Sequence, residues 1–190
     1  FFAALQTLKR QGKIMAYHDR SDGGLLATVA EMLFASRQGI RLQIQDLGED
    51  WLAALFNEEL GGVMQVAAQD MPDVLAVFEA EGLSDCMGVI GCLAVDQTLS
   101  IYHGDKKLFS SSRSALQSCW SEVSYRMQAL RDNPACARQQ FEAISDDNDP
   151  GLHVRLTFDV NQDISAPYVN KARPKIAILR EQGVNGHVEM

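Results

Sequence analysis

The sequence has no apolar run long enough to cross a membrane and no signal-peptide pattern at its amino terminus, which argues against a membrane protein. It is also poor in positive charge, because 17 Lys and Arg residues stand against 25 Asp and Glu residues, for a net charge of −8. That balance argues against general binding to nucleic acid or to an anionic membrane. A local anion site stays possible, since a helix N-terminus attracts anions without net positive charge.

Cysteine is scarce as well. The four cysteines, Cys86, Cys92, Cys119 and Cys136, form no CxxC pair and no zinc-like spacing with the four histidines. We therefore predict free thiols in a reducing compartment, which indicates a cytoplasmic protein. Cys119 falls on an apolar helical stripe and is predicted to be a small core residue.

Apolar residues make up 46% of the 190 positions, which is sufficient for one good core plus additional segments. Their periodicity predicts helices and strands in mixed order, including a hairpin of 86–95 with 99–102 through Asp96 and Gln97. The order indicates an α+β or α/β domain in which helices cover a mixed sheet. The other predicted helices lie at 1–10, 25–34, 51–56, 72–81, from Ser111 or Ser112 to about 132, and 134–141, and the other strands at 14–17, 40–44, 63–67 and 152–156.

The stretch His18–Leu25, with the sequence His-Asp-Arg-Ser-Asp-Gly-Gly-Leu, is the main functional candidate. It connects a predicted strand to a predicted helix, and α/β proteins commonly bind ligands at such connections. Asp19 and Asp22 offer hard oxygen ligands to Mg²⁺. Gly23 and Gly24 let the backbone approach a phosphate closely, next to a helix N-terminus that favours anions.

A structural role explains the same residues. Ser21 or Asp22 could cap the following helix while the two glycines form the turn. A second polar cluster, Asn57-Glu58-Glu59-Leu60-Gly61-Gly62, could touch a ligand, although a solvated loop is the favoured interpretation.

Three segments together resemble one enzyme family. They are His18–Leu25, the segment Phe-Asn-Glu-Glu-Leu-Gly at 56–61, and the segment Arg-Pro-Lys-Ile-Ala-Ile-Leu-Arg-Glu-Gln-Gly-Val-Asn-Gly at 173–186. Their order and distances resemble the large, single-chain phosphoribosylformylglycinamidine synthases of purine biosynthesis, over nearly the whole chain. Those enzymes use ATP and glutamine to convert formylglycinamide ribonucleotide into formylglycinamidine ribonucleotide, with ammonia carried internally from a glutaminase domain.

The resemblance implies three regions. Residues 1–145 correspond to a domain like the C-terminal domain of aminoimidazole ribonucleotide synthetase, and 146–174 to a connecting segment. Residues 175–190 correspond to the first strand and loop of a class I glutamine amidotransferase domain. The ends of the chain lead us to expect a piece of a longer polypeptide, whose catalytic synthetase half and glutaminase domain would be its partners.

The resemblance also implies a bound nucleotide, ATP or ADP with Mg²⁺, in a structural and non-catalytic copy of the active site. Asp19 is then a Mg²⁺ ligand and Ser21 a nucleotide contact, with Asp22, Gly23 and Gly24 in support. No cysteine lies in the Gly-x-Cys-x-Gly elbow of such a glutaminase, so no catalytic residue is predicted in this chain. The alternative is a non-catalytic scaffold that docks the glutaminase domain and binds no ligand of its own.

Overall fold

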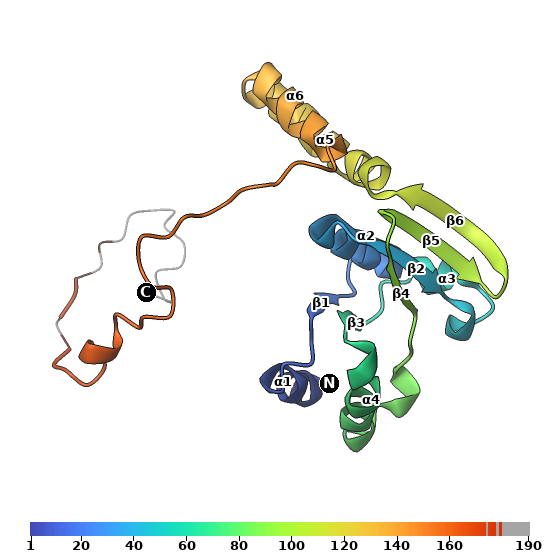
Figure 1. The fold of residues 1–190 in the computed structure, drawn as a ribbon, viewed down its shortest axis with the longest axis horizontal. Coiled ribbons are helices and arrows are strands. Elements are labelled where there is room, and N and C mark those ends of the chain that lie inside the picture. The colour runs from blue at the N-terminus through green and yellow to red at the C-terminus, as the bar shows by residue number, and fades with distance from the viewer. Residues whose placement is uncertain (174, 178, 180–190) are drawn as a thin grey trace. The chain divides into compact units, whose positions relative to one another are not determined.

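The computed structural model describes residues 1–173, 175–177 and 179 (Figure 1). The chain divides into two compact units, Phe1–Asp149 and Pro150–Met190. The α-helices and strands of the first unit are α1 (Phe2–Arg10), β1 (Ala16–Asp19), α2 (Gly24–Ser36), β2 (Gly39–Gln43), α3 (Trp51–Phe56), β3 (Gly62–Gln65), α4 (Met71–Ala80), β4 (Gly91–Ala94), β5 (Thr98–His103), β6 (Lys106–Ser112), α5 (Arg113–Arg131) and α6 (Pro134–Glu142).

The larger sheet has the strand order β4-β2-β5-β6. β2 pairs antiparallel with β4 and parallel with β5, and β5 pairs antiparallel with β6. The predicted hairpin of 86–95 with 99–102 is therefore wrong, because β2 lies between these two strands (Figure 1). The hairpin of this sheet joins β5 to β6 around Gly104, and β6 itself was not predicted.

The main core lies between α2 and the larger sheet. Leu25, Val29 and Leu33 recur at four-residue intervals, so they share one face of α2. They pack against a buried cluster from β2, the residue after it, the end of α3 and β5. This cluster consists of Leu42, Ile44, Leu55, Leu99 and Ile101. The predicted class, helices packed on a mixed sheet, is confirmed.

β1 and β3 form a separate two-stranded sheet. The helices α1 and α4 pack against each other nearby, where Ala4 and Leu8 meet Val74 and Phe78 in a second buried cluster. Lys13, which follows α1, forms ion pairs with Asp70 and Asp73 at the start of α4.

Most of the apolar side of α5 faces outward, against the prediction, and only its first residue, Leu116, packs against the main core among the described residues. Cys119, predicted to be buried, is exposed, and so is Trp120 on the same side. The 3.6-residue period identified the helix and its stripe correctly. It could not say which side the rest of the fold covers, because amphipathic helices pack by whichever face finds a complementary surface.

The unit Pro150–Met190 has one short 3₁₀ turn among its described residues, Ala166–Tyr168. The predicted strand at 152–156 is wrong, because these residues are exposed and unpaired, and an alternating segment needs a neighbouring strand for its backbone hydrogen bonds. The predicted strand at 175–179 and loop to 190 include residues outside the described part. Among the described residues, no helix combines the length and apolar character needed to cross a membrane.

Candidate functional site

The antiparallel pairing of β1 with β3 brings the two polar clusters of the sequence together. Asp19, the last residue of β1, lies opposite Gly62, the first residue of β3. The pairing continues one step further, since the Arg20 N–H donates to the Gly61 carbonyl at 2.9 Å. The loop after β1 therefore lies beside the segment 57–61, as the two predicted motifs require if they share a site.

Arg20 joins the two clusters through its side chain. Its Nε donates to the Asn57 carbonyl and an Nη donates to the Ala54 carbonyl, both at 3.1 Å. Its other Nη lies 2.7 Å from Glu59 Oε1. These bonds satisfy carbonyls at the C-terminal end of α3, so Arg20 holds that end of α3 against the loop. Sequence reasoning passed over Arg20 because nothing local indicates these distant partners.

The N-terminus of α2 is capped from the second cluster. Gly23 is the N-cap residue, with φ of 81° and no hydrogen bond from a capping side chain. Its N–H donates instead to Glu58 Oε1 at 2.9 Å. The suggestion that Ser21 or Asp22 caps this helix is therefore wrong. Glu58 carries the negative charge that a helix N-terminus favours, and it is not simply part of a solvated loop.

Gly24 allows α2 to begin in close contact with the end of α3. A Cβ at this position would lie 2.8 Å from the Leu55 carbonyl oxygen and 2.8 Å from the Phe56 carbonyl carbon. Its φ of 69° also lies in the left-handed region that disfavours other residues. Position 24 is therefore restricted to glycine by both space and backbone conformation.

The Asp19 side chain is exposed and has one hydrogen-bond partner two residues away in the chain. The Tyr17 hydroxyl donates to Asp19 Oδ1 at 2.5 Å. Partial burial, reinforced by this hydrogen bond and by the negative charge of Asp19, raises the pKa of Tyr17 to about 12. Within the described residues, Asp19 Oδ2 has no hydrogen-bond donor, so one carboxylate oxygen stays available for a ligand.

Two further contacts fix the end of β1 against α2. His18 Nε2 lies 2.6 Å from Glu31 Oε2 of α2. The buried Thr28 hydroxyl bridges the Asp19 carbonyl at 3.3 Å and the Gly24 carbonyl at 3.0 Å. The backbone on both sides of the loop is therefore held in place, while the Asp19 side chain stays exposed.

The donor set fits Mg²⁺ only in part. In the described part of the chain, no group of three or more His, Cys, Asp or Glu side chains could hold a metal ion. Mg²⁺ is often bound by one or two carboxylates and completed by water and phosphate oxygens. Asp19 can supply one such carboxylate, and the remaining ligands would have to come from the nucleotide, water or another part of a larger protein.

The other predicted site residues follow Asp19 along the chain, and none of them forms a hydrogen bond with its carboxylate, whose one hydrogen-bond partner among the described residues is Tyr17. Ser21 and Asp22 are exposed in the turn, and the Ser21 carbonyl accepts from the Gly24 N–H at 2.9 Å. The sequence pattern thus placed all five residues at one strand-to-helix connection, which Asp19 begins at the end of β1 and Gly24 ends at the start of α2. It missed the roles of Arg20 and Tyr17, and it favoured a solvated loop for the cluster that contains Glu58, because these roles depend on the pairing of β1 with β3.

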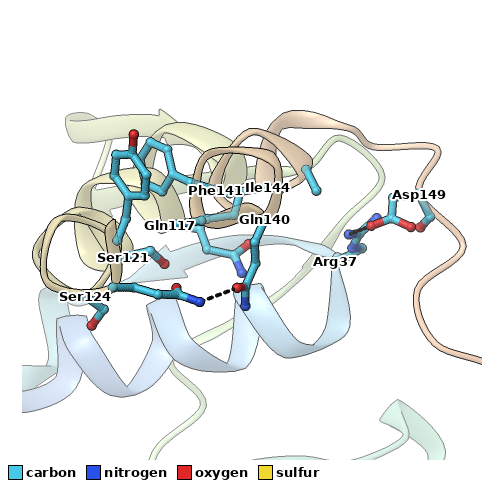
Figure 2. Close-up of a pocket in the computed structure, with 12 residues that line it drawn as sticks. Arg37, Gln117, Ser121, Ser124, Gln140, Phe141, Ile144 and Asp149 are labelled. Atoms are coloured by element: carbon cyan, nitrogen blue, oxygen red, sulfur yellow. Dashed lines mark hydrogen bonds and ion pairs between the residues drawn. The ribbon is translucent and has the colours of Figure 1, made fainter. Parts of the chain in front are cut away.

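A cavity of about 410 Å³ lies elsewhere, between the end of α2, α5 and α6 (Figure 2). Its lining mixes polar side chains, such as Gln117, Ser121 and Gln140, with apolar and aromatic ones, such as Phe141 and Ile144. None of the predicted site residues lines it.

Comparisons with known proteins agree with the fold. The family described as AIR synthase related protein, C-terminal domain, matches residues 1–104. Thermotoga maritima PurL in complex with FGAR aligns with 60% of this chain at a TM-score of 0.52 and 14% identity. PurLQS from Thermotoga maritima aligns at 0.53 and 14%, and PurL in complex with ATP at 0.52 and 14%, both over 60% of this chain. This chain spans a fifth of the length of each of these relatives, and identities at this level support the fold alone.

Proposed function

This chain belongs to the AIR synthase related proteins through their C-terminal domain, and from that premise we propose that it supplies part of a Mg²⁺–nucleotide site in a phosphoribosylformylglycinamidine synthase. The observation that carries the proposal is the meeting of the two sequence motifs at the end of β1. There Asp19, the Gly23–Gly24 turn and Glu58 lie around one helix N-terminus.

Asp19 is the proposed metal ligand. Its carboxylate is exposed, and one of its two oxygens is held by the Tyr17 hydroxyl. That hydrogen bond orients the carboxylate, and the second oxygen is the one we assign to the cation. A bound Mg²⁺ would neutralise phosphate charge at this place.

The phosphates of ATP or ADP would then lie near Ser21 and the start of α2. A serine hydroxyl can donate to a phosphate oxygen, and the backbone N–H groups of a helix N-terminus favour anions. Asp22 and Gly24 shape the same turn. The Gly23 N–H already donates to Glu58, so a phosphate that uses this N–H must displace the Glu58 carboxylate.

We propose a structural, non-catalytic copy of the nucleotide site, as the resemblance to the synthase family implies. The full reaction, with glutamine as the amide donor, would need the other parts of the larger enzyme. Residues 1–145 are then the synthetase-like domain, 146–174 the connection and 175–190 the start of the glutaminase.

A scaffold without ligand binding is the second candidate. The observation that favours it is the absence of a multi-residue metal cluster among the described residues. In that case Glu58 is a permanent cap of α2, and the Tyr17–Asp19 bond is purely structural.

Titration calorimetry of ADP with and without Mg²⁺ distinguishes the two candidates. We expect Mg²⁺-dependent binding to the wild-type protein, loss of that binding in Asp19→Asn, and no change in the matched control Asp85→Asn, an exposed aspartate on a 3₁₀ turn. Binding that is equal with and without Mg²⁺ would reject the metal site, and no binding at all would support the scaffold.

A further inference from the structure

Arg113, the first residue of α5, carries a charge that is almost completely buried, with 1% of the residue exposed. Its Nε donates to Gln97 Oε1 at 2.6 Å, one Nη donates to Gln117 Oε1 at 2.7 Å, and the other Nη pairs with the Asp147 carboxylate. Among the described residues, Asp147 is the one acidic side chain that pairs with this guanidinium. A buried charge that loses its partner is strongly destabilising, so a buried Arg113 requires Asp147.

Asp147 belongs to the short acidic segment 146–149, which we call the strap. A second arginine holds the same segment. Arg37, which follows α2, donates to the Asp149 carbonyl at 3.0 Å and to the Asp146 carbonyl at 3.3 Å, and it lies 4.0 Å from Asp149 Oδ2. Figure 2 shows Arg37 and Asp149 next to each other beside the cavity between α2, α5 and α6. The strap is therefore fixed both to the end of α2 and to the start of α5.

The helical pair α5 and α6 has little apolar contact with the rest of its unit. Leu116 is the one residue of this pair that packs against either buried apolar cluster, among the described residues. The Trp120 ring also contacts Phe34 of α2, with 5.9 Å between ring centroids. A cavity of about 410 Å³ lies where further side chains would otherwise fill the space between the pair and the end of α2. Unfilled space forfeits the dispersion contacts that hold packed helices together, so the polar contacts of Arg113 and Arg37 matter more here.

We propose that the strap is a releasable lock, in which Asp147 closes over the buried Arg113 and so holds the α5–α6 pair against α2 and the larger sheet. The Asp147 side chain is 54% exposed and can move into water. Arg113 cannot follow, because its N–H donates to the Gln97 carbonyl at 2.7 Å and its side chain is enclosed. Once Asp147 leaves, water must reach the guanidinium, and this requires the start of α5 to move away from its neighbours.

The lock also couples the helical pair to the course of the chain beyond it. The strap ends at Asp149, and Pro150 begins the second unit. The contacts that hold α5 in place are therefore the same contacts that fix the point at which the chain leaves the first unit. This inference does not depend on the proposed nucleotide site, because none of its residues belongs to that site.

Hydrogen exchange of the full chain, resolved by peptide, tests the lock. In Asp147→Asn the side chain can still accept a hydrogen bond, but it no longer neutralises the arginine, and hydrogen bonds between charged partners are the stronger ones. Helices without tertiary support are marginal in water. We therefore expect the amides of α5 and α6 to exchange roughly tenfold faster than in the wild type, while those of α2 and β5 keep their rates.

Asp146→Asn is the matched control, because it makes the same change one residue away within the strap. The Asp146 side chain accepts from the Asn148 N–H at 2.9 Å, and among the described contacts it pairs with neither arginine. An asparagine can accept the same hydrogen bond. This variant should leave the exchange rates of α5 and α6 unchanged.

Arg113→Met distinguishes the ion pair from a general disturbance of the strap. Methionine keeps an unbranched apolar stem but removes the buried charge, so Asp147 has nothing left to neutralise. In the Arg113→Met background, the further change Asp147→Asn should have no effect on the exchange of α5 and α6. The comparison of the single and double variants isolates the interaction between the two residues.

Trp120 reports the same movement by fluorescence. The chain has two tryptophans, so Trp120 is the only one that remains in a Trp51→Phe background. Its contact with Phe34 should be lost when the lock opens, and acrylamide should then quench Trp120 more strongly in Asp147→Asn than in the parent.

Three results would overturn the proposal. The first is wild-type exchange and quenching in Asp147→Asn. The second is faster exchange that extends equally over α2, β5, α5 and α6, which would indicate a global loss of stability. The third is an effect of Asp147→Asn that is as large in Arg113→Met as in the wild type.

Discussion

The Gly23 N–H donates a hydrogen bond to Glu58 Oε1 at 2.9 Å, so the N-terminus of α2 is capped by a carboxylate from a loop far along the chain. This contact has two consequences. It ties the α3–β3 connection to the start of α2, and it places a negative charge where the proposed phosphate would lie.

Glu58→Gln should therefore affect folding and binding in opposite directions. Glutamine keeps a hydrogen-bond acceptor but removes the charge, so the free energy of unfolding should fall by about 0.3–1 kcal/mol, the usual effect of a charge at a helix N-terminus. Affinity for Mg²⁺–ADP should rise, because the phosphate no longer competes with a fixed anion. Chemical denaturation and calorimetry measure the two effects.

Glu49→Gln is the matched control for Glu58→Gln, since Glu49 is exposed and lies outside this contact. Weaker nucleotide binding in Glu58→Gln would contradict displacement and indicate that Glu58 itself helps to hold the ligand.

Asp19→Asn separates a metal ligand from a structural residue. A ligand at about a hundred times its dissociation constant stabilises the folded state by roughly 2.7 kcal/mol, and this increment should disappear in Asp19→Asn. Ser21→Ala should weaken the free energy of nucleotide binding by a smaller amount, about the 0.5–1.5 kcal/mol of one hydrogen bond. The measurements are nucleotide content after purification of the full-length protein and its melting temperature. Equal nucleotide content in wild type and Asp19→Asn would show that Asp19 does not hold the cation.

Gly24→Ala should destabilise the fold more than Gly12→Ala. Both glycines have φ of 69°, so both alanines incur the strain of the left-handed region, about 1–2 kcal/mol. Only at Gly24 does the new Cβ meet backbone, at 2.8 Å from the Leu55 carbonyl oxygen, whereas nothing lies within 4 Å of a Cβ at Gly12. Overpacking of this kind adds about 1–3 kcal/mol.

Urea unfolding of the two glycine variants measures the difference directly. An equal decrease in the free energy of unfolding for Gly12→Ala and Gly24→Ala would mean that the start of α2 and the end of α3 can move apart without a loss of stability.

Tyr17 should ionise late in an alkaline titration. Its pKa is raised to about 12, first by burial and then by the hydrogen bond and charge of Asp19. Ultraviolet absorbance of the tyrosinate, compared with that of Tyr17→Phe, assigns the step. Asp19→Asn should lower the pKa of Tyr17, because it removes a negative charge while leaving the burial in place.

The same shift has a defined effect on stability. The folded protein holds the Tyr17 proton more tightly than the unfolded chain, whose tyrosine ionises near pH 10. The stabilisation is therefore complete below pH 10 and is lost as the pH rises from about 10 toward 12. A Tyr17→Phe protein with the same loss of stability over this range would show that Tyr17 is not its source.

Local sequence was sufficient for the features that depend on neighbours in the chain. Ser112, one of the two residues predicted to cap α5, accepts from the Ala115 N–H at 3.2 Å. Asn133 and Pro134 separate α5 from α6 as predicted, and Asn133 caps α6. Caps and breaks form within a single turn, so the residues that determine them are adjacent in sequence.

Strand order could not be obtained in the same way. The segments 86–95 and 99–102 are close in sequence and suit a hairpin, yet β2 inserts between them. The insertion depends on close backbone approach, because a Cβ at Gly91 would lie 2.3 Å from the Arg41 carbonyl oxygen. Which strands pair depends on the packing of all the strands in the sheet. The pattern of residues within one segment carries no information about its partners.

The same distinction between local and long-range features applies to the candidate site. By itself the sequence determined that one connection from a strand to a helix contains the five residues Asp19, Ser21, Asp22, Gly23 and Gly24, because turn chemistry and apolar periodicity are local. Only the tertiary structure decided that Glu58 caps α2, that Tyr17 holds Asp19, and that most of the apolar side of α5 faces outward. Each of these depends on which surfaces meet once the chain has folded, and burial and long-range pairing decide that together.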